Sequence, residues 1–456
     1  MLARFSARLA DVAQRVVPDP FVIALLLTGV AFALGMAVMP EPDAMALASG
    51  WFDRFSASGT LTFTTQMALI LVAGAALAQA PAVHAVLGRL ADMPRSTRSA
   101  AALTAFVAMA ASLLNWGFGL IAGAVLAHQI GVRAKASGRA INYPLVGAAG
   151  YMGLLVWHGG LSGSAPLKVT EGLSSDWLLK NGESVPGIAL DETLFSPLNL
   201  GVSLGLLVLV PWLFMRMSRD GRERVPQEIL DREPPPSVGG ERFSALSRLL
   251  GLLVVALGVM ALVGRLLESE AWWRALSLDV VILLLVLAGM LLFGTPLRYG
   301  RAFCSAVPEA GGILLQFPFY FGILGILQAS GLVDMLAQNS ADMARTLASL
   351  GLPLQWSFDV TTFFSAGLVN LFVPSGGGQW AVQGSILVQA TDELGLPLPR
   401  AVMALSYGDE WTNMLQPFWA LALLGITGLK ARDILGYTMT VMLCSVVVYL
   451  GAFALL

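Results

Sequence analysis

Six runs without a charged side chain decide what this chain can fold into. A helix of about 20 apolar residues crosses the hydrocarbon core of a bilayer. Of the 456 residues, 56% are hydrophobic and 12% are charged, whereas about a quarter of the residues of a soluble domain carry a charge. The sequence therefore predicts an all-α polytopic membrane protein. The runs, which approach or exceed span length, cover residues 21–39, 100–130, 197–215, 249–264, 280–297 and 434–456.

The N-terminal segment and the cysteines indicate the compartment. Residues 1–18 carry arginines interspersed with apolar residues, and no small-residue cleavage site follows the first span. We interpret this segment as an amphipathic helix on the cytoplasmic face and not as a signal peptide. Cys304 and Cys444 lie at or in apolar segments, so we expect neither disulfides nor a metal cluster. Ala-rich spans without long extracellular domains suit a bacterial inner membrane.

Basic residues in the loops predict the orientation of the spans, because cytoplasmic loops are enriched in Lys and Arg. Three arginines precede the first span, whereas the loop 40–60 carries one basic residue, so we expect a cytoplasmic N-terminus. The same count predicts a periplasmic C-terminus. The resulting organisation is a first membrane repeat over residues 19–216, an Arg-rich cytoplasmic linker over 217–248, a connecting span over 249–268 and a second repeat over 279–456.

Two of the apolar stretches are interrupted by residues that break helices. The stretch at about 100–131 contains Asn115-Trp116-Gly117 and has basic residues on both flanks, which predicts a re-entrant hairpin entering from the cytoplasm. The stretch at about 352–390 contains Pro374-Ser375-Gly376-Gly377-Gly378, and the topology predicts a hairpin entering from outside. In a helix interior each Gly costs about 1 kcal/mol and Pro about 3 kcal/mol relative to Ala. Non-helical backbone at membrane depth is tolerated where it lines a cavity.

Weak sequence matches relate the two halves. Gly123 and Gly384 lie 261 positions apart, as do Arg139 and Arg400. The connecting span 249–268 makes the second half inverted with respect to the first. Inverted repeats with paired hairpins and discontinuous helices are a design of secondary transporters, in which the site lies where the broken helices meet.

An acidic pair marks a second interruption in the C-terminal half. Asp409 and Glu410 lie in the string 407–413, which is walled by hydrophobic residues and contains no lysine or arginine. Ionisable residues within a membrane are costly and indicate function by default. We expect an ion-coupling role in which Na⁺ binds near Ser375, Asp409 and Asn413, or in which one carboxylate carries a proton. A structural pair at an interface is the alternative.

The first half offers counterparts to these features. Asn115–Gly119 corresponds to the Ser-Gly-Gly-Gly string, and Gly147–Gly153 with Trp157-His158-Gly159-Gly160 corresponds to the acidic interruption. His158 is a further candidate for ion coupling, although a histidine at a helix end is more often solvated or satisfied structurally. His84 and His128 are interpreted as interface residues.

The interruptions supply the candidate substrate-binding residues. Free N–H groups and the positive end of a half-helix suit a carboxylate. The aromatic residues beside the interruptions could form an apolar wall, although Trp is also common at membrane interfaces. They are Trp116, Phe118, Trp380 and Trp411. The scarcity of basic residues favours a small monoanion accompanied by Na⁺ or H⁺. The candidates are Asn115, Trp116, Gly117, Ser375, Gly376, Gly377, Gly378, Gln379, Trp411, Thr412 and Asn413.

At these residues the chain resembles the short-chain fatty acid transporter family. The similarity rests on the strings 373–384 and 408–419, on Asn115-Trp116-Gly117 and on Pro18-Asp19-Pro20-Phe21, and it extends over essentially the whole chain. The resemblance implies membership of the ion-transporter superfamily, with scaffold and elevator-moving transport domains. It implies uptake of monocarboxylates such as butyrate or acetoacetate, and a homodimer. The Ser-Asn-Thr tips of other members of that superfamily are replaced here by Ser-Gly-Gly-Gly and Trp-Thr-Asn.

We therefore expect a secondary active transporter that acts as a cation symporter. We expect no enzymatic activity, no cofactor beyond Na⁺ or H⁺ and no nucleic-acid partner. Its partners are the bilayer and a small carboxylate. One alternative keeps the fold but carries a dicarboxylate or an amino acid, and a passive anion channel is another. A membrane-embedded hydrolase is disfavoured because no His-Glu-x-x-His motif is present.

Overall fold

The computed structural model describes most of the chain. The described ranges are residues 20–171, 173–178, 184–185, 187–218, 244–269, 275–371, 373, 375–416 and 419–456. The expected N-terminal helix and residues 219–243 of the expected linker 217–248 lie outside these residues, whereas residues 244–248 of that linker are helical. Phe372 and Pro374, next to the Ser-Gly-Gly-Gly string, also lie outside them.

The described residues form helices and one small sheet. The first half contains the α-helices α2 (Pro20–Val38), α3 (Ala44–Ser56), α4 (Ser58–Ala78), α5 (Pro81–Asp92), α6 (Thr97–Leu114), α7 (Trp116–Ala136), α8 (Tyr143–Gly150), α9 (Ser164–Lys168) and α10 (Pro197–Met217). It also contains the 3₁₀ helices η1 (Met152–Leu155), η2 (Trp157–Gly159) and η3 (Val169–Glu171), and the strands β1 (Leu173–Leu178) and β2 (Ser184–Val185), which pair antiparallel.

The second half is helical throughout its described residues. Its α-helices are α11 (Ser244–Glu268), α12 (Leu278–Phe293), α13 (Pro296–Ala306), α14 (Gly311–Ala329), α15 (Leu332–Ser349), α16 (Leu354–Asn370), α17 (Gly376–Leu394), α18 (Leu398–Thr412), α19 (Leu421–Thr427) and α20 (Ala431–Leu455), with the 3₁₀ helices η6 (Val307–Ala310) and η7 (Asn413–Leu415). The helical fold class predicted from composition is confirmed, and the short β1–β2 pair is an addition to it.

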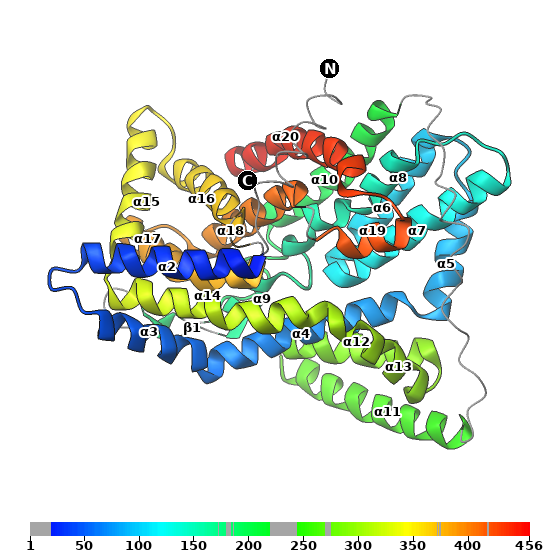
Figure 1. Ribbon diagram of the computed structural model, residues 1–456, viewed down its shortest axis with the longest axis horizontal. Coiled ribbons are helices and arrows are strands. Elements are labelled where there is room, and N and C mark those ends of the chain that lie inside the picture. Colours follow the sequence, from blue (N-terminus) through cyan, green and yellow to red (C-terminus); the bar gives the residue numbers. More distant parts are fainter. Residues whose placement is uncertain are drawn as a thin grey trace.

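Within the described part of the chain, seven helices are long and apolar enough to cross a membrane, namely α4, α6, α7, α10, α11, α14 and α20. The protein is therefore a multi-pass membrane protein, as composition predicted. Their burial differs widely: 72% of the apolar window of α4 is buried inside the protein, against 11% of that of α11. Figure 1 shows α11 beside α12 at the edge of the molecule, whereas α4 passes through its middle.

Side-chain caps explain where many of these helices begin. Ser, Thr and Asn prefer the N-cap position because their side-chain oxygen accepts a hydrogen bond from an otherwise unpaired N–H group of the first turn. The capping side chains are Ser96 for α6, Asn115 for α7, Asn142 for α8, Ser196 for α10, Ser277 for α12, Thr295 for α13 and Ser375 for α17.

Small residues bring α6 and α7 into close contact. A Cβ atom at Gly119 would lie 1.9 Å from Ser112 Oγ, and one at Gly123 would lie 2.9 Å from Ala108 Cβ. Because these partners run in opposite directions along the chain, the two helices are antiparallel. Gly123 also faces the backbone carbonyl of Gly150 on α8. The contact depends on the absence of side chains, as in other close helix pairs of membrane proteins.

The later pair, α16 and α17, is joined by polar side chains. Gln379 on α17 donates to the carbonyl of Ala366 on α16 over 2.8 Å, and Gln383 donates to Ser365 Oγ over 3.3 Å. A cavity of about 190 Å³ lies beside these side chains, lined mainly by α16 and α17. The two helices are therefore held together by hydrogen bonds at discrete points.

Several apolar stretches are divided into more than one helix. The stretch 61–87 divides into α4 and α5, because Pro81 begins a new helix. The stretch 141–157 divides into α8, η1 and η2. The loop expected at 40–60 contains α3, which begins where Asp43 accepts hydrogen bonds from the N–H groups of Met45 and Ala46. Figure 1 shows α3 packed along α14 together with α2.

The close packing of α7 generates a test. We expect Gly123→Ala to lower the stability of the protein by about 1–3 kcal/mol, because the added Cβ would lie 2.3 Å from the Gly150 carbonyl oxygen. Thermal unfolding in detergent measures this change. Gly451→Ala on α20 is the matched control, since nothing lies within 4 Å of its Cβ position. Equal unfolding temperatures for the two variants would contradict the assigned contact.

Candidate functional site

Two of the helices begin with the same backbone and capping geometry. Asn115 has φ −159° and ψ 128°, and Ser375 has φ −163° and ψ 114°, so both are extended N-cap residues. Asn115 Oδ1 accepts from the N–H of Phe118 over 2.8 Å, and Ser375 Oγ accepts from that of Gly378 over 3.3 Å. The Ser-Gly-Gly-Gly string thus forms the first turn of α17, where glycine costs less than in a helix interior.

Contacts with four aromatic rings explain why this turn contains three glycines. A Cβ atom at Gly376 would lie 2.7 Å from His158 Cε1 and Trp157 Cη2, one at Gly377 would lie 2.7 Å from Phe317, and one at Gly378 would lie 2.5 Å from a ring carbon of Tyr320. Real Cβ atoms essentially never approach other atoms that closely. The glycines therefore allow the positive end of α17 to approach η2 and α14.

A small pocket lies at this end of α17. Its free volume is about 20 Å³, room for about one water molecule by the same measure. The lining comes from α4, α7, α9, α14, the 3₁₀ helices and the starts and ends of broken helices. The lining residues are Met67, Trp116, Leu154, Trp157, Ser164, Ile313, Phe317, Ser375, Gly376, Gly377, Asn413 and Trp419.

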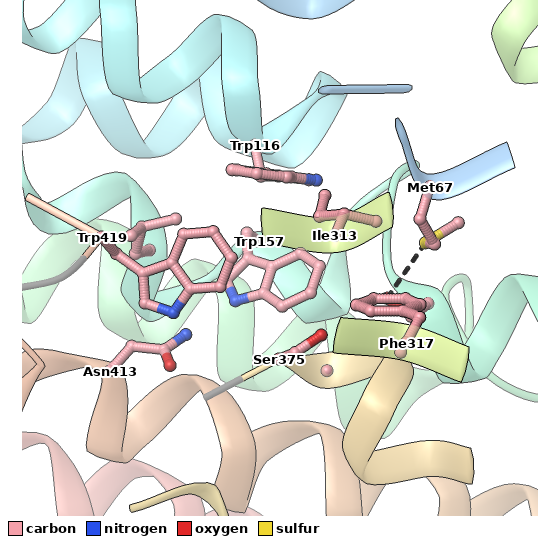
Figure 2. A pocket seen from close by; sticks show the side chains of 12 residues that line it. Met67, Trp116, Trp157, Ile313, Phe317, Ser375, Asn413 and Trp419 are labelled. Atoms are coloured by element: carbon pink, nitrogen blue, oxygen red, sulfur yellow. Dashed lines mark hydrogen bonds between the residues drawn. The ribbon is translucent and has the colours of Figure 1, made fainter. Parts of the chain in front are cut away.

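The pocket has a polar end and an apolar end. Figure 2 shows Ser375 and Asn413 on the side toward which the indole nitrogens of Trp157 and Trp419 point. Met67, Ile313 and Phe317 lie toward the other end, where a hydrogen bond joins Ser164 Oγ to the sulfur of Met67.

One buried donor faces the polar end without a partner. Trp157 is 7% exposed, and its indole Nε1 makes no hydrogen bond. The first N–H groups of α17 likewise have no acceptor within their own helix. Buried donors of this kind are costly unless an acceptor satisfies them. The polar end therefore suits a ligand that brings acceptor oxygens, such as a carboxylate.

The acidic pair lies behind this pocket. Asp409 and Glu410 are 0% and 1% exposed. The sequence predicted a helix interruption at 407–413, but α18 continues through Thr412, and the chain leaves the helix at η7. The helix remains intact because both carboxylates find partners in η2, so no break in α18 is needed to satisfy them.

Asp409 is paired with His158 of the first half. Asp409 Oδ2 lies 2.8 Å from His158 Nδ1, and the N–H of Ala165 donates to His158 Nε2 over 3.1 Å. Since Nε2 accepts a hydrogen bond, the hydrogen of the neutral ring is assigned to Nδ1, which donates to Asp409. The missing local partner of Asp409 is therefore 251 positions away in the chain.

Glu410 is bonded to the backbone of the same segment. Its Oε2 accepts from the N–H groups of His158 and Gly159 over 3.0 and 3.4 Å. Its Oε1 lies 3.3 Å from the hydroxyl of Tyr449, which also lies 3.0 Å from the carbonyl of Leu155. The acidic pair thus fixes the segment that carries Trp157.

Asn370 at the end of α16 connects the polar end to α18. Its Nδ2 donates to the carbonyl of Asp409 over 2.7 Å, to Thr412 Oγ1 over 3.0 Å and to Asn413 Oδ1 over 2.9 Å. Gln416 Nε2 donates to the carbonyl of Asn370 over 2.5 Å. In the described part of the chain, no group of three His, Cys, Asp or Glu side chains could hold a metal ion.

The structure brings together part of the predicted substrate set. Five of the predicted residues line the pocket, namely Trp116, Ser375, Gly376, Gly377 and Asn413. The others lie nearby in capping or helix-joining roles, namely Asn115, Gly117, Gly378, Gln379 and Thr412. Trp411 lies elsewhere: its ring packs on Phe363 and Phe364, and its Nε1 donates to the carbonyl of Met442.

The prediction missed lining residues of two kinds. Trp157 and Trp419 lie beside helix interruptions, so the pattern that selected Trp116 could have selected them. Met67, Ile313 and Phe317 occupy ordinary positions in apolar helices and carry no local signal. Of the proposed aromatic wall, Trp116 lines the pocket, whereas Phe118, Trp380 and Trp411 do not.

One string of the sequence matches a hydrolase pattern. Gly201-Val202-Ser203-Leu204-Gly205 has the form Gly-x-Ser-x-Gly. In hydrolases this serine occupies a sharp turn between a strand and a helix. Here the whole string lies inside α10. It therefore does not form a nucleophile elbow.

Comparison with known proteins identifies the family. The model of the family described as "Short chain fatty acid transporter" matches residues 1–456. The chain belongs to this family. Its members are transporters and not enzymes, and the resemblance found in the sequence is confirmed.

Two relatives agree over their full lengths. A protein of Escherichia coli K12 named "Putative short-chain fatty acid transporter" is 36% identical over 463 aligned positions, which cover 98% of each chain. A protein of Haemophilus influenzae with the same name is 33% identical over 99% of each chain.

Solved structures of transporters share the fold. MtrF of Neisseria gonorrhoeae, whose structure is described as illuminating a class of antimetabolite efflux pumps, superimposes with a TM-score of 0.60 at 14% identity, covering 98% of this chain and 96% of that one. The YdaH transporter of Alcanivorax borkumensis gives a TM-score of 0.54 at 15% identity, covering 96% and 97%.

The pairing of His158 and Asp409 can be tested by removing the histidine. We expect His158→Ala to destabilise the protein by about 3–5 kcal/mol, because Asp409 would remain as a buried charge without its partner. Asp409→Asn should cost less, since the amide oxygen still accepts from Nδ1. Thermal unfolding in detergent compares the two variants. A smaller loss for His158→Ala than for Asp409→Asn would contradict the pairing.

Proposed function

We propose that this protein is a secondary active transporter for short-chain monocarboxylates such as butyrate or acetoacetate. The observation that carries the proposal is the two-ended pocket. The unpartnered Trp157 N–H, Ser375, Asn413 and the start of α17 provide donors for one carboxylate. Met67, Ile313 and the ring of Phe317 provide an apolar end for a short tail. The family description and the names of the two relatives refer to short-chain fatty acids, which supports the same cargo.

The charge of the lining favours a monoanion. None of the residues that line the pocket is Lys or Arg. A dicarboxylate or an amino acid would present a second charged group to the apolar end, whose lining residues Met67, Ile313 and Phe317 carry no charge. We therefore rank transport of a dicarboxylate or an amino acid below transport of a monocarboxylate.

We further propose that uptake is coupled to a cation. Asp409, Glu410 and His158 are buried next to the pocket, and Trp157 stacks on His158 with ring centroids 4.5 Å apart. Na⁺ near Ser375, Asp409 and Asn413, or a proton on a carboxylate, would balance the charge of the substrate. A passive anion channel would need no such group.

The arrangement in the membrane follows from the same reasoning. We propose an inverted repeat with re-entrant hairpins at α6–α7 and α16–α17, supported by the equivalent caps Asn115 and Ser375. The proposal further includes a homodimer in the inner membrane whose pocket moves by an elevator mechanism. Its N-terminus is cytoplasmic and its C-terminus periplasmic. Cross-linking of single-cysteine variants on α11 would test the dimer, since that helix is largely exposed.

Counterflow in proteoliposomes tests the function. Vesicles loaded with unlabelled butyrate should accumulate labelled butyrate or acetoacetate transiently, and protein-free vesicles should not. External succinate should not compete. Accumulation driven by an imposed Na⁺ gradient, or by a proton gradient beyond the accumulation seen in protein-free vesicles, would support symport and exclude a channel. Failure of counterflow with every monocarboxylate tested would refute the proposed cargo.

Trp157→Phe tests the carboxylate end. The variant keeps an aromatic ring but removes the free N–H, so we expect butyrate to bind about 10-fold more weakly or worse, the size of a lost hydrogen bond to a charged group. Trp212→Phe, an exposed tryptophan on α10, is the control and should bind as the unmodified protein does. Equal affinities for the two variants would argue against the assigned donor. Titration calorimetry measures both affinities.

Phe317→Ala tests the apolar end. Because this ring closes the apolar end of the pocket, its removal should enlarge that end and admit longer tails, so the ratio of hexanoate to propionate counterflow should rise about 10-fold. Phe364→Ala, on an exposed part of α16, is the control. An unchanged ratio would place the tail elsewhere.

A further inference from the structure

The contacts of Glu410 suit a protonated carboxyl group. The hydroxyl of Tyr449 has one hydrogen, yet it lies within hydrogen-bond distance of two acceptors, the Leu155 carbonyl and Glu410 Oε1. Both contacts are satisfied together when Glu410 carries a proton on Oε1 and donates it to Tyr449, which donates to Leu155. The Oε2 atom keeps its two backbone N–H donors in either state.

The neighbouring groups do not offer an equivalent proton site. His158 accepts from the Ala165 N–H at Nε2, so a second ring hydrogen would face that N–H group. Asp409 Oδ2 accepts from the ring, and its Oδ1 has no partner, so a proton there would lack an acceptor. Glu410 is thus the member of the cluster whose protonated form has a complete set of partners.

The other charged and titratable groups around α18 are few. Tyr407 and Asp409 lie on α18 itself, His158 on η2 and Tyr449 on α20. On α16, Asp359 is bound by Arg400 of α18 over 2.6 Å, so that charge is already paired. On α9, the ammonium group of Lys168 lies 5.7 Å from the centre of the Phe63 ring. Within the described residues, the only basic side chain at salt-bridge distance from either carboxylate is His158.

We infer that the coupling ion of this transporter is a proton and that Glu410 binds it. The inference rests on the proposed function and identifies the ion at the same site. Loss of the proton requires Tyr449 to turn its hydrogen from the Leu155 carbonyl to Glu410 Oε1. The segment 152–159, which then loses the hydrogen bond at the Leu155 carbonyl, also carries Leu154 and Trp157, which line the pocket. Substrate and proton are linked through that segment, so each strengthens the binding of the other.

The test measures butyrate binding and proton uptake by the purified protein in detergent. This choice avoids passive diffusion of the uncharged acid across vesicles. Between pH 6 and 8 a simple carboxylate stays ionised, so any pH dependence belongs to the protein. We expect the affinity to fall up to 10-fold per pH unit on the alkaline side, with about one proton taken up per butyrate bound.

Glu410→Gln should abolish both signals. The amide mimics the protonated acid, so we expect affinity to change by less than twofold across the range, with no proton uptake. Glu192→Gln, an exposed residue of the first half, is the control and should keep the pH dependence. A Glu410→Gln protein with the original pH dependence would overturn the inference, as would binding in the unmodified protein that needs Na⁺ and ignores pH. Absence of butyrate binding by the unmodified protein at every pH would instead refute the proposed function.

Tyr449→Phe provides a second variant if Glu410→Gln does not fold. It leaves the carboxyl group but removes the hydroxyl that donates to Glu410 once the proton is lost. Because a hydrogen bond to an ionised group is the stronger one, the pH dependence should persist with its midpoint about 0.5–1 unit higher. Tyr437→Phe is the matched control, because that tyrosine lies on the same helix and contacts Asn142. An unchanged midpoint in Tyr449→Phe would overturn the role of the Glu410–Tyr449 contact.

Discussion

A neutral histidine held between a carboxylate and a backbone amide is the interaction on which the centre of this protein depends. His158 joins Asp409 of the second half to Ala165 of the first, and the adjacent N–H groups bind Glu410. In a medium without water these partners are the available means of satisfying two buried carboxylates. The same interaction fixes η2, and so it places Trp157 against the start of α17.

The start of α17 could be predicted from the sequence, and so could the equivalent start of α7. Helix-breaking strings within apolar stretches locate Asn115 and Ser375, because caps and glycines act within one helical turn. The extent of α18 could not be predicted in this way. A run such as 407–413 resembles an interruption when its carboxylates lack local partners, and the partner that keeps the helix intact is 251 positions distant.

The apolar half of the pocket could not be predicted from sequence patterns for a different reason. Ile313 and Phe317 are spaced as any buried helical residues are, and only the approach of α17 to α14 turns them into a lining. Trp411 illustrates the converse. It follows an acidic pair that belongs to the site, yet on the helix it points to Phe363 and α20.

The two pairs of helices differ in how they are joined. Contacts of Gly119 and Gly123 with α6 leave no space between α6 and α7, whereas Gln379 and Gln383 join α16 and α17 at separate points beside a cavity. Hydrogen bonds between amides can be exchanged for hydrogen bonds to water at little net free-energy cost. The van der Waals contacts of closely packed helices have no such replacement.

The double engagement of His158 has a chemical consequence. Reagents that acylate imidazole, and ions such as Zn²⁺ that bind it, require a ring nitrogen with a free lone pair. Nδ1 and Nε2 of this histidine are both occupied, and the ring is 0% exposed. The other two histidines of the chain, His84 and His128, are partly exposed. The residue at the centre of the protein is thereby its least reactive imidazole.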